Sequence, residues 1–327
     1  MGAITRADTH RGSIARRSVR AVASLLATRQ IDTRRGETPD LGRGFSWLHL
    51  APYVVLHAGC LGVLWVGWSP FAVGFAVGFY LLRAFFVTAF YHRYFSHRAF
   101  RTSRGTQFVF AVLGNTAVQR GPLWWASHHR RHHRHTDSPG DPHSPVRSFL
   151  WSHLGWLTAR EHAATDLGVV PDLARFPELR WLDRWDTLVP ALVAVGTWGL
   201  GSLLAGLAPS LGTDGPQMLV WGFFVSTVIL FHVTCMVNSV AHLFGSRPYD
   251  TGDESRNNWL VATLSLGEGW HNNHHFAPGA ARQGFRAWEI DPTWWGLRLL
   301  ERLGVISGPR PVPARARIAR RRTGRSG

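Results

Sequence analysis

The sequence of 327 residues predicts an all-α integral membrane protein, with four transmembrane helices arranged as two hairpins below a cytosolic helical cap. The first observation behind this prediction is a set of four apolar stretches, each close to the ~20 residues that a helix needs to cross a bilayer. They cover about residues 47–68, 71–91, 188–209 and 217–240. A soluble protein with buried core helices is the alternative, and four such stretches in one chain count against it. The second observation is that histidine clusters lie beside the inner ends of these stretches, which predicts the cap.

Each apolar stretch has the composition of a membrane span. Arg83 is the one charged residue inside the four stretches. Tryptophan near the ends, as at Trp47, Trp68 and Trp221, is typical of the interface between bilayer and water.

The distribution of arginine predicts the topology. The two short connections, at residues 68–70 and 210–215, contain none, whereas the N-terminal arm, the long middle loop and the C-terminal region are rich in arginine. The positive-inside rule therefore places both termini and the middle loop in the cytoplasm. We expect a basic, disordered arm at 1–45, a folded domain at 46–300 and a basic tail at 301–327.

The net charge and the cysteines limit the classes of partner and metal site. A charge of +16 would suit a nucleic-acid binder, but 45% hydrophobic residues and four spans exclude that class. We expect the arginines to set the topology and to contact anionic head groups, so that the partners are membrane lipids. Cys60 and Cys235 lie far apart in apolar stretches and offer no thiolate metal site.

Histidines gather in three clusters beside the predicted membrane boundaries. Two clusters have i, i+3, i+4 spacing, which places three imidazoles on one face of a helix. The third is a pair five residues apart, so an α-helix has to end or bend between its members to bring them together. A single histidine, four residues after Asn238, stands at the end of the fourth span. The clusters are His92 and His97; His129, His132 and His133; and His271, His274 and His275; the single residue is His242.

Nine histidines that meet at one boundary predict a metal centre. A zinc site takes about four ligands, so nine imidazoles suit two ions with four or five nitrogens each. Imidazole binds iron, copper, nickel and zinc, so the ligand type leaves the metal open, and iron is our expectation because a pair of irons activates dioxygen. Single histidines in apolar runs, such as His57 and His232, are expected to be hydrogen-bonded structural residues. The pattern assigns no role to His128, His135, His143 and His153.

With their flanks, the clusters resemble the histidine boxes of membrane fatty-acyl desaturases, in particular the Δ9 acyl-CoA (stearoyl-CoA) desaturase branch. The boxes of that family, H-x4-H, H-x2-H-H and H-x2-H-H, match the three clusters in order. The flanks WWASHHRRHH, TDSPGDPHSP and EGWHNNHH match as well. NSVAHLFG resembles the segment that supplies a further histidine ligand, here His242, and a water-holding asparagine, here Asn238. The likeness covers about Trp47 to Trp295.

The resemblance implies an oxygen-dependent dehydrogenation of a long-chain saturated fatty acyl-CoA. Two iron ions would be the cofactor, dioxygen the co-substrate and a cis double bond at Δ9 the product. Electrons would come from a separate ferredoxin, cytochrome or NAD(P)H-dependent reductase. Because an unactivated C–H bond offers acids and bases nothing to act on, the shape of an apolar tunnel has to select the reacting carbons. Tyr80, Phe86 and Trp221 are candidates for its lining.

Carboxylates near the boxes are expected to orient the imidazoles. Asp137, Asp141 and Glu268 are the nearest ones in sequence. Ordinary loop carboxylates that pair with the many arginines are the alternative.

The acyl carrier is the least determined part of the resemblance. In the animal branch an arginine just before the second box contacts the carrier, and Ser127 stands at that position here. Arg120, Arg130 and Arg131 are the candidates to replace it, because guanidinium groups suit phosphate. Acyl-CoA is the expected substrate, and acyl chains on phospholipid or on a carrier protein remain open.

Two alternative functions stay beside the desaturase. A hydroxylase or ketolase on the same di-iron scaffold would insert oxygen instead of removing hydrogen, and the flanking motifs favour desaturation. A non-enzymatic membrane protein that carries metal or haem is more remote, because transport calls for polar residues within the spans and haem needs one or two axial histidines.

Overall fold

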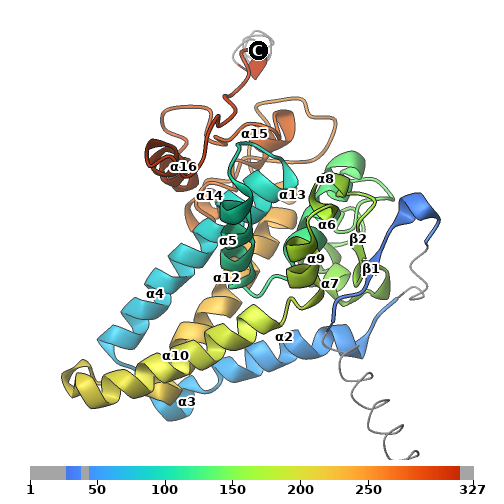
Figure 1. The fold of residues 1–327 in the computed structure, drawn as a ribbon. Coiled ribbons are helices and arrows are strands. Elements are labelled where there is room, and N and C mark those ends of the chain that lie inside the picture. Colours follow the sequence, from blue (N-terminus) through green and yellow to red (C-terminus); the bar gives the residue numbers. More distant parts are fainter. Residues whose placement is uncertain (1–26, 38–43, 317–327) are drawn as a thin grey trace, which may run out of the picture.

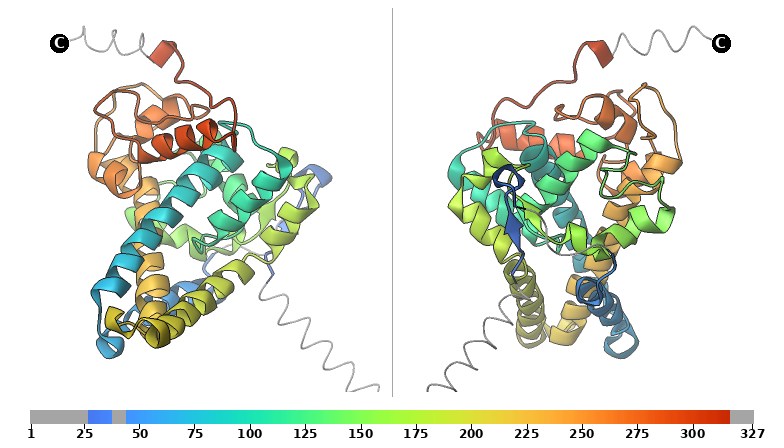
Figure 2. Two further views of the ribbon diagram at one scale, coloured as in Figure 1. Left: turned by 60° about the vertical axis from the view of Figure 1, so that its left-hand side comes forward. Right: turned by 90° about the vertical axis from the view of Figure 1, so that its right-hand side faces the viewer.

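The structure is a computed structural model, which describes residues 27–37 and 44–316. Four long apolar helices extend from one side of a helical cap, as Figures 1 and 2 show. Each is long and apolar enough to cross a membrane, which confirms the four predicted spans. Their bounds are Trp47–Val66, Pro70–Ser96, Leu188–Leu207 and Gly215–Leu243.

The spans are built from shorter helical elements. The first consists of α2 (Trp47–Cys60) and α3 (Val63–Val66), and the second of α4 (Pro70–Phe85) and the π-helix η2 (Phe86–Ser96). The third is α10 (Leu188–Leu207), with the short 3-10 helix η5 (Pro209–Leu211) after it. The fourth runs through α11 (Gly215–Met218), the π-helix η6 (Leu219–Val225), α12 (Ser226–Asn238) and α13 (Val240–Leu243).

The cap is formed by the long middle loop and the C-terminal region. From the middle loop come α5 (Arg104–Asn115), α6 (Pro122–His135), η3 (Trp151–Gly155), α7 (Trp156–Thr158), η4 (Arg160–His162), α8 (Pro171–Ala174) and α9 (Pro177–Arg184). The C-terminal region adds α14 (Trp259–Leu264), α15 (His271–Phe276) and α16 (Pro292–Arg302). Strand β2 (Thr165–Asp166) pairs in parallel with β1 (Gln30–Ile31), and η1 (Thr33–Arg35) follows β1.

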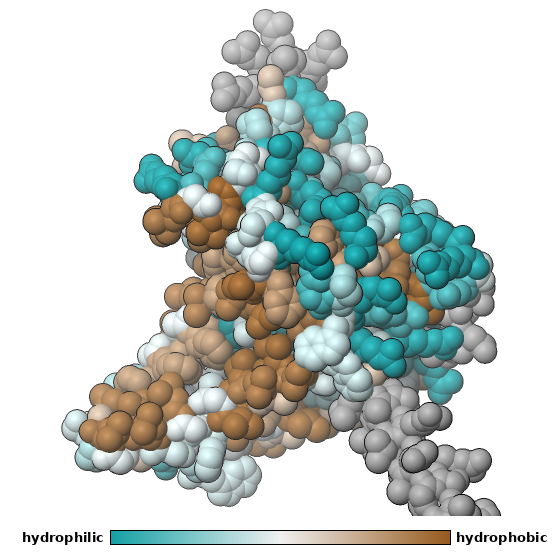
Figure 3. Space-filling model, viewed as in Figure 1, coloured by the Kyte–Doolittle hydropathy of each residue, from teal (hydrophilic) through white to brown (hydrophobic). Residues whose placement is uncertain are grey.

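In the view of Figure 3 the surface of the spans is mainly apolar and that of the cap is mainly polar, apart from an apolar patch at α16. Large apolar side chains such as Val55, Leu192 and Val195 are more than 60% exposed on the spans. Such an exposed apolar surface is typical of a face that lipid covers.

Arg83, the one charge inside the predicted spans, is fully buried between the second and fourth spans. Its guanidinium donates hydrogen bonds to the hydroxyl groups of Ser226 and Thr227 and to the backbone carbonyl of Thr116. No carboxylate is among its recorded partners within the described residues. Charged residues inside membrane proteins face the protein interior in this way, because lipid cannot solvate them.

The second span ends between His92 and His97, as the sequence predicts, but its last part is a π-helix, which the sequence did not predict. The helix widens into η2, which ends at Ser96, and the amide of the C-cap residue His97 donates to the carbonyl of His92 at 3.3 Å. Hydrogen bonds from residue i to i+5 place residues five apart above one another, so both imidazoles face the same side. Gly114 allows α5 to approach η2 closely, because a Cβ there would lie 2.2 Å from the Tyr91 ring.

Part of the N-terminal arm is ordered, which differs from the disorder predicted for 1–45. Residues 27–37 carry β1 and η1 and contact the cap, and Thr28 Oγ1 donates to Asp186 at 2.8 Å. Residues 1–26 and 38–43 lie outside the described part. In the predicted tail 301–327, Ile306 and Ala316 are buried, and residues 317–327 lie outside the described part.

Candidate metal centre

Four elements bring the nine predicted histidines to one place inside the cap. The pair on η2 meets the cluster on α6, and the cluster on α15 meets both of these and the single histidine on α13. The two i, i+3, i+4 clusters lie on helices, as their spacing predicts. The nine side chains form two groups, and within each group one ring nitrogen per residue lies within 4.8 Å of all the others.

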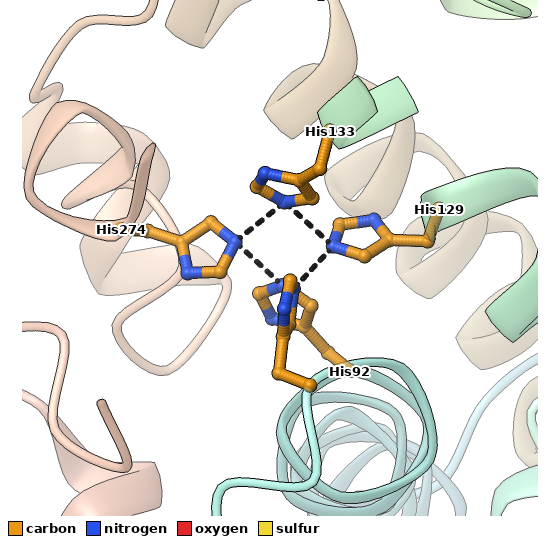
Figure 4. A group of neighbouring side chains, drawn as sticks. His92, His129, His133 and His274 are labelled. Carbon is orange, nitrogen blue, oxygen red and sulfur yellow. Dashed lines mark hydrogen bonds between the residues drawn. The ribbon is translucent and has the colours of Figure 1, made fainter. Parts of the chain in front are cut away.

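The first group contains five histidines. Nε2 of His274 lies 3.0 Å from Nε2 of His92 and 2.9 Å from Nε2 of His133. Nε2 of His129 lies 3.0 Å from Nε2 of His133 and 2.7 Å from Nε2 of His97. Figure 4 shows four of these rings pointing their nitrogens at a common centre.

The second group contains four histidines. Nε2 of His271 lies 3.0 Å from Nε2 of His242 and 3.1 Å from Nε2 of His275. Nε2 of His132 lies 3.3 Å from Nε2 of His275. Four and five nitrogens are the numbers expected for two separate ions.

Carboxylates contact the Nδ1 atoms of several of these imidazoles, on the side of the ring opposite to the centre. Each of the three carboxylates predicted for this role contacts Nδ1 of a box histidine, and a fourth, Asp253, was not predicted. The contacts are Asp141 with His132 at 3.0 Å, Asp137 with His242 at 3.4 Å, Asp253 with His275 at 2.8 Å, and Glu268 with His92. Because an ionised carboxylate only accepts hydrogen bonds, Nδ1 carries the proton and Nε2 presents its lone pair.

This proton arrangement tests whether the residues fit a metal. In the second group, His132, His242 and His275 present unprotonated Nε2 atoms, and those of His132 and His275 face each other at 3.3 Å. Lone pairs that face each other across about 3 Å repel, so a cation between them satisfies the arrangement. The donor set therefore fits a metal ion.

Burial keeps these imidazoles neutral, which is the form that binds metals. Burial, followed by the neighbouring imidazoles, lowers the pKa of His132, His133 and His274 well below the usual value. The same two causes, in the same order, lower the pKa of His129 and His271.

A buried ionic network, also not predicted, supports the first box. Arg93 is 1% exposed, and its guanidinium donates to Glu268 at 3.1 Å and to Asp291 at 2.9 Å. Gln283 donates to the second oxygen of Glu268 at 3.1 Å, and its amide nitrogen lies 3.4 Å from Nδ1 of His274. The position of Arg93 directly after His92 is the one sequence signal for this network.

Two adjoining, mainly apolar cavities reach the centre. Both are lined by Trp125, His129, Thr234 and Asn238, so the asparagine predicted to hold a water faces the space between the two cavities. The predicted lining is wrong for these two cavities. None of Tyr80, Phe86 and Trp221 lines either one, because the hydroxyl of Tyr80 and the indole of Trp221 bond backbone carbonyls and Phe86 packs in the core.

All three arginines proposed for the carrier contact carboxylates within the cap. Arg130 contacts Asp172 at 2.6 Å, and Arg131 contacts Asp166 at 3.1 Å. Arg120 contacts Asp186 at 3.2 Å, and it also lines one cavity. The residue at the arginine position of the animal branch, Ser127, is buried and donates to the carbonyl of Trp124.

The remaining histidines lie outside the two groups. Nε2 of His57 lies 2.9 Å from Nε2 of His232, which confirms the hydrogen bonding predicted for both. His128 bonds the carbonyl of Trp124. His143 lines the cavity that Arg120 also lines, and its ring packs against that of His132.

Four apolar spans below a cap with nine convergent imidazoles define a membrane protein of the histidine-box type. The chain belongs to the fatty acid desaturase family, whose family model matches residues 66–297. It is therefore related to enzymes of the oxidoreductase kind that act on fatty acyl groups.

Known relatives include desaturases of lipid-linked and of CoA-linked acyl chains. The chain is 37% identical to an sn-2 palmitoyl-lipid 9-desaturase of Nostoc sp. (strain 36), over 85% of this chain and 95% of that one. It is 36% identical to an sn-1 stearoyl-lipid 9-desaturase of Anabaena variabilis, over 80% and 93%. It is 38% identical to an acyl-CoA C20 Delta5-desaturase of Anemone leveillei, over 80% and 82%.

Proposed function

We propose that this protein is an oxygen-dependent di-iron desaturase that introduces a cis double bond at Δ9 into a long-chain saturated acyl group. The observation that carries the proposal is the convergence of nine Nε2 atoms in two groups beside an apolar cavity. All nine histidines are proposed as ligands, and Asn238 as the holder of a water next to the four-histidine group.

The stoichiometry of desaturation defines what the protein has to supply. Two C–H bonds and the O–O bond break, and a C=C bond and two waters form, which requires two electrons and two protons from outside. Two bound irons supply the dioxygen chemistry. The electrons are proposed to come from a separate ferredoxin, cytochrome or NAD(P)H-dependent reductase.

The protein's own residues bind, orient and keep the reaction dry. Asp141, Asp137 and Asp253 fix the tautomers of their histidines, so that the lone pairs stay directed at the centre. Trp125 lines both cavities, and with Leu230 it would hold an acyl chain against the centre. Burial of the site excludes water, which prevents side reactions of oxygen.

The acyl carrier has two candidates. Acyl-CoA is the one that the sequence favours. An acyl lipid is the second, because Arg130 and Arg131 already pair with Asp172 and Asp166 and because several relatives are lipid 9-desaturases by name.

The protein is proposed to be a multi-pass membrane protein with both termini and the centre on the cytoplasmic side. The distribution of arginine supports this orientation. A cysteine-labelling experiment on intact cells tests it, with single cysteines placed in residues 68–70 and in the cap.

Expression in a host that lacks desaturases tests the function directly. Fatty-acid methyl esters are measured by gas chromatography–mass spectrometry, beside a culture that carries His132→Ala. A new monounsaturated ester that is absent from the variant supports the proposal, and its fragmentation gives the bond position. A hydroxylated product, or no product from iron-loaded protein with a reductase supplied, contradicts it.

A further inference from the structure

An apolar groove runs along the first span on the face that lipid covers. It lies between α2, α7 and α12 and has a volume of about 450 Å³, within the roughly 300–1,000 Å³ of ligand sites. One stripe of α2 forms its floor, with Leu50, Val54, Ala58 and Leu61 three or four residues apart. Val54 and Leu61 are 54% and 58% exposed, so the groove opens toward the bilayer.

The groove adjoins the cavity that leads to the metal centre. Tyr53, Leu157 and Phe231 line both spaces, so these three side chains form the wall between them. The rings of Tyr53 and Phe231 pack at 5.1 Å between centroids. Beyond the wall, the cavity reaches His129 and Asn238 at the centre.

A chain of three histidines fixes the elements around the groove. His57 on α2 contacts His232 on α12 at 2.9 Å, and His232 contacts His153 on η3 at 3.0 Å. These contacts tie α2, α12 and the cap together at the edge of the groove. With the helices held in place, entry through the groove requires rotation of the wall side chains.

We propose that this groove is the lateral entrance for a saturated acyl chain of a glycerolipid in the leaflet next to the cap. The inference rests on the proposed function and names its acyl carrier. A glycerolipid with two long chains stays in the bilayer, because each methylene that leaves it meets water. Its chain has to enter from the side, and the groove leads from the lipid face to the wall of the cavity that reaches the centre. Acyl-CoA arrives from water and has no need of such a path.

Two matched tryptophan substitutions on α2 test the proposal. Ala58→Trp fills the groove, whereas Val55→Trp places the same indole on an exposed face of the same helix that does not line it. Each protein is reconstituted in phosphatidylglycerol vesicles that carry a deuterated palmitoyl chain, and is assayed separately with stearoyl-CoA added from solution. Ferredoxin, its reductase and NADPH supply electrons in both assays. Unsaturated products and bound iron are measured by mass spectrometry.

Ala58→Trp is expected to lower desaturation of the lipid chain about tenfold relative to Val55→Trp, with the same iron content. Any rate with stearoyl-CoA is expected to stay unchanged. Equal lipid rates for the two variants would overturn the lateral entrance. Conversion of stearoyl-CoA by the unsubstituted protein, without conversion of the lipid, would overturn it as well and leave the desaturase proposal standing. No product from either substrate by iron-loaded protein would overturn both.

Discussion

The chain contains two sets of connected histidines, and they differ in where their protons lie. The first set is the row of His57, His232 and His153 that runs from α2 to η3. One proton per ring satisfies every contact between these three rings. Nδ1 of His57 donates to the carbonyl of Tyr53, Nε2 of His232 donates to His57, and Nε2 of His153 donates to Nδ1 of His232. This set is a complete hydrogen-bonded chain of neutral imidazoles and needs no ion.

No such assignment satisfies the nine histidines of the cap. Carboxylates accept hydrogen bonds from Nδ1 of His132, His242 and His275, which leaves the Nε2 lone pairs of His132 and His275 facing each other at 3.3 Å. The comparison teaches that short distances between imidazoles do not identify a metal site. Convergence of unprotonated nitrogens, enforced by partners on the opposite side of each ring, does.

Metal removal is expected to have the largest effect, and to act on the cap centre alone. A chelator should abolish desaturation. It should also lower the free energy of unfolding by about 3 to 4 kcal/mol if iron is present at 100 to 1,000 times its Kd. Thermal unfolding of the protein in detergent, with and without added iron, measures this. If His232→Phe changed the size of the iron-dependent increment, the two histidine sets would not be independent.

Loss of one ligand comes next. His274 contacts both His92 and His133 in the five-histidine group, so His274→Ala should remove an ion from that group. We expect product to fall by about 100-fold or more, with a matching loss of iron by mass spectrometry. His232→Ala is the control and should keep its iron. A His274→Ala protein with full iron content would contradict the assignment.

Replacing a carboxylate that contacts a ligand histidine should weaken metal binding without removing a ligand. In Asp253→Asn, the amide can donate to Nδ1 of His275 and so move the ring proton to Nε2. Metal affinity should fall by about 10- to 100-fold, as measured by competition with a chromogenic chelator. Asp250→Asn, on the same loop but away from the histidines, is the control. Equal affinities for these two variants would show that the carboxylate does not set the tautomer.

Much of the fold and of the centre follows from local sequence. Hydropathy gives the four spans, and i, i+3, i+4 spacing gives the two helical clusters on α6 and α15. The helix ends between His92 and His97, as the spacing indicated, but the prediction assumed an α-helix and did not include the π-helix η2, which changes which residues share a face.

The features of the site that the sequence did not predict depend on contacts between segments that are distant in sequence. Asp253 reaches His275 from 22 positions away, on a loop with nothing in its composition that marks it. Arg130 and Arg131 pair with carboxylates 42 and 35 positions away, and the sequence around the second box does not indicate these partners. Long-range pairing of this kind is fixed by the packed cap and not by local pattern.

Breaking the histidine chain between the spans should have the smallest effect, and it sharpens the comparison most. His232→Phe keeps a ring of similar shape but removes both contacts, which leaves Nε2–H of His153 without its partner. Interhelical hydrogen bonds in membranes contribute about 0.6 kcal/mol each on average, so the two together should lower the free energy of unfolding by about 1 kcal/mol.

Iron content should be unchanged, because no Nε2 atom of the centre contacts this residue. Thermal unfolding of the iron-loaded variant beside the unsubstituted protein measures the change. Loss of iron from His232→Phe would mean that the chain positions the centre through Ser239, whose side chain contacts His153 and which lies three residues before His242.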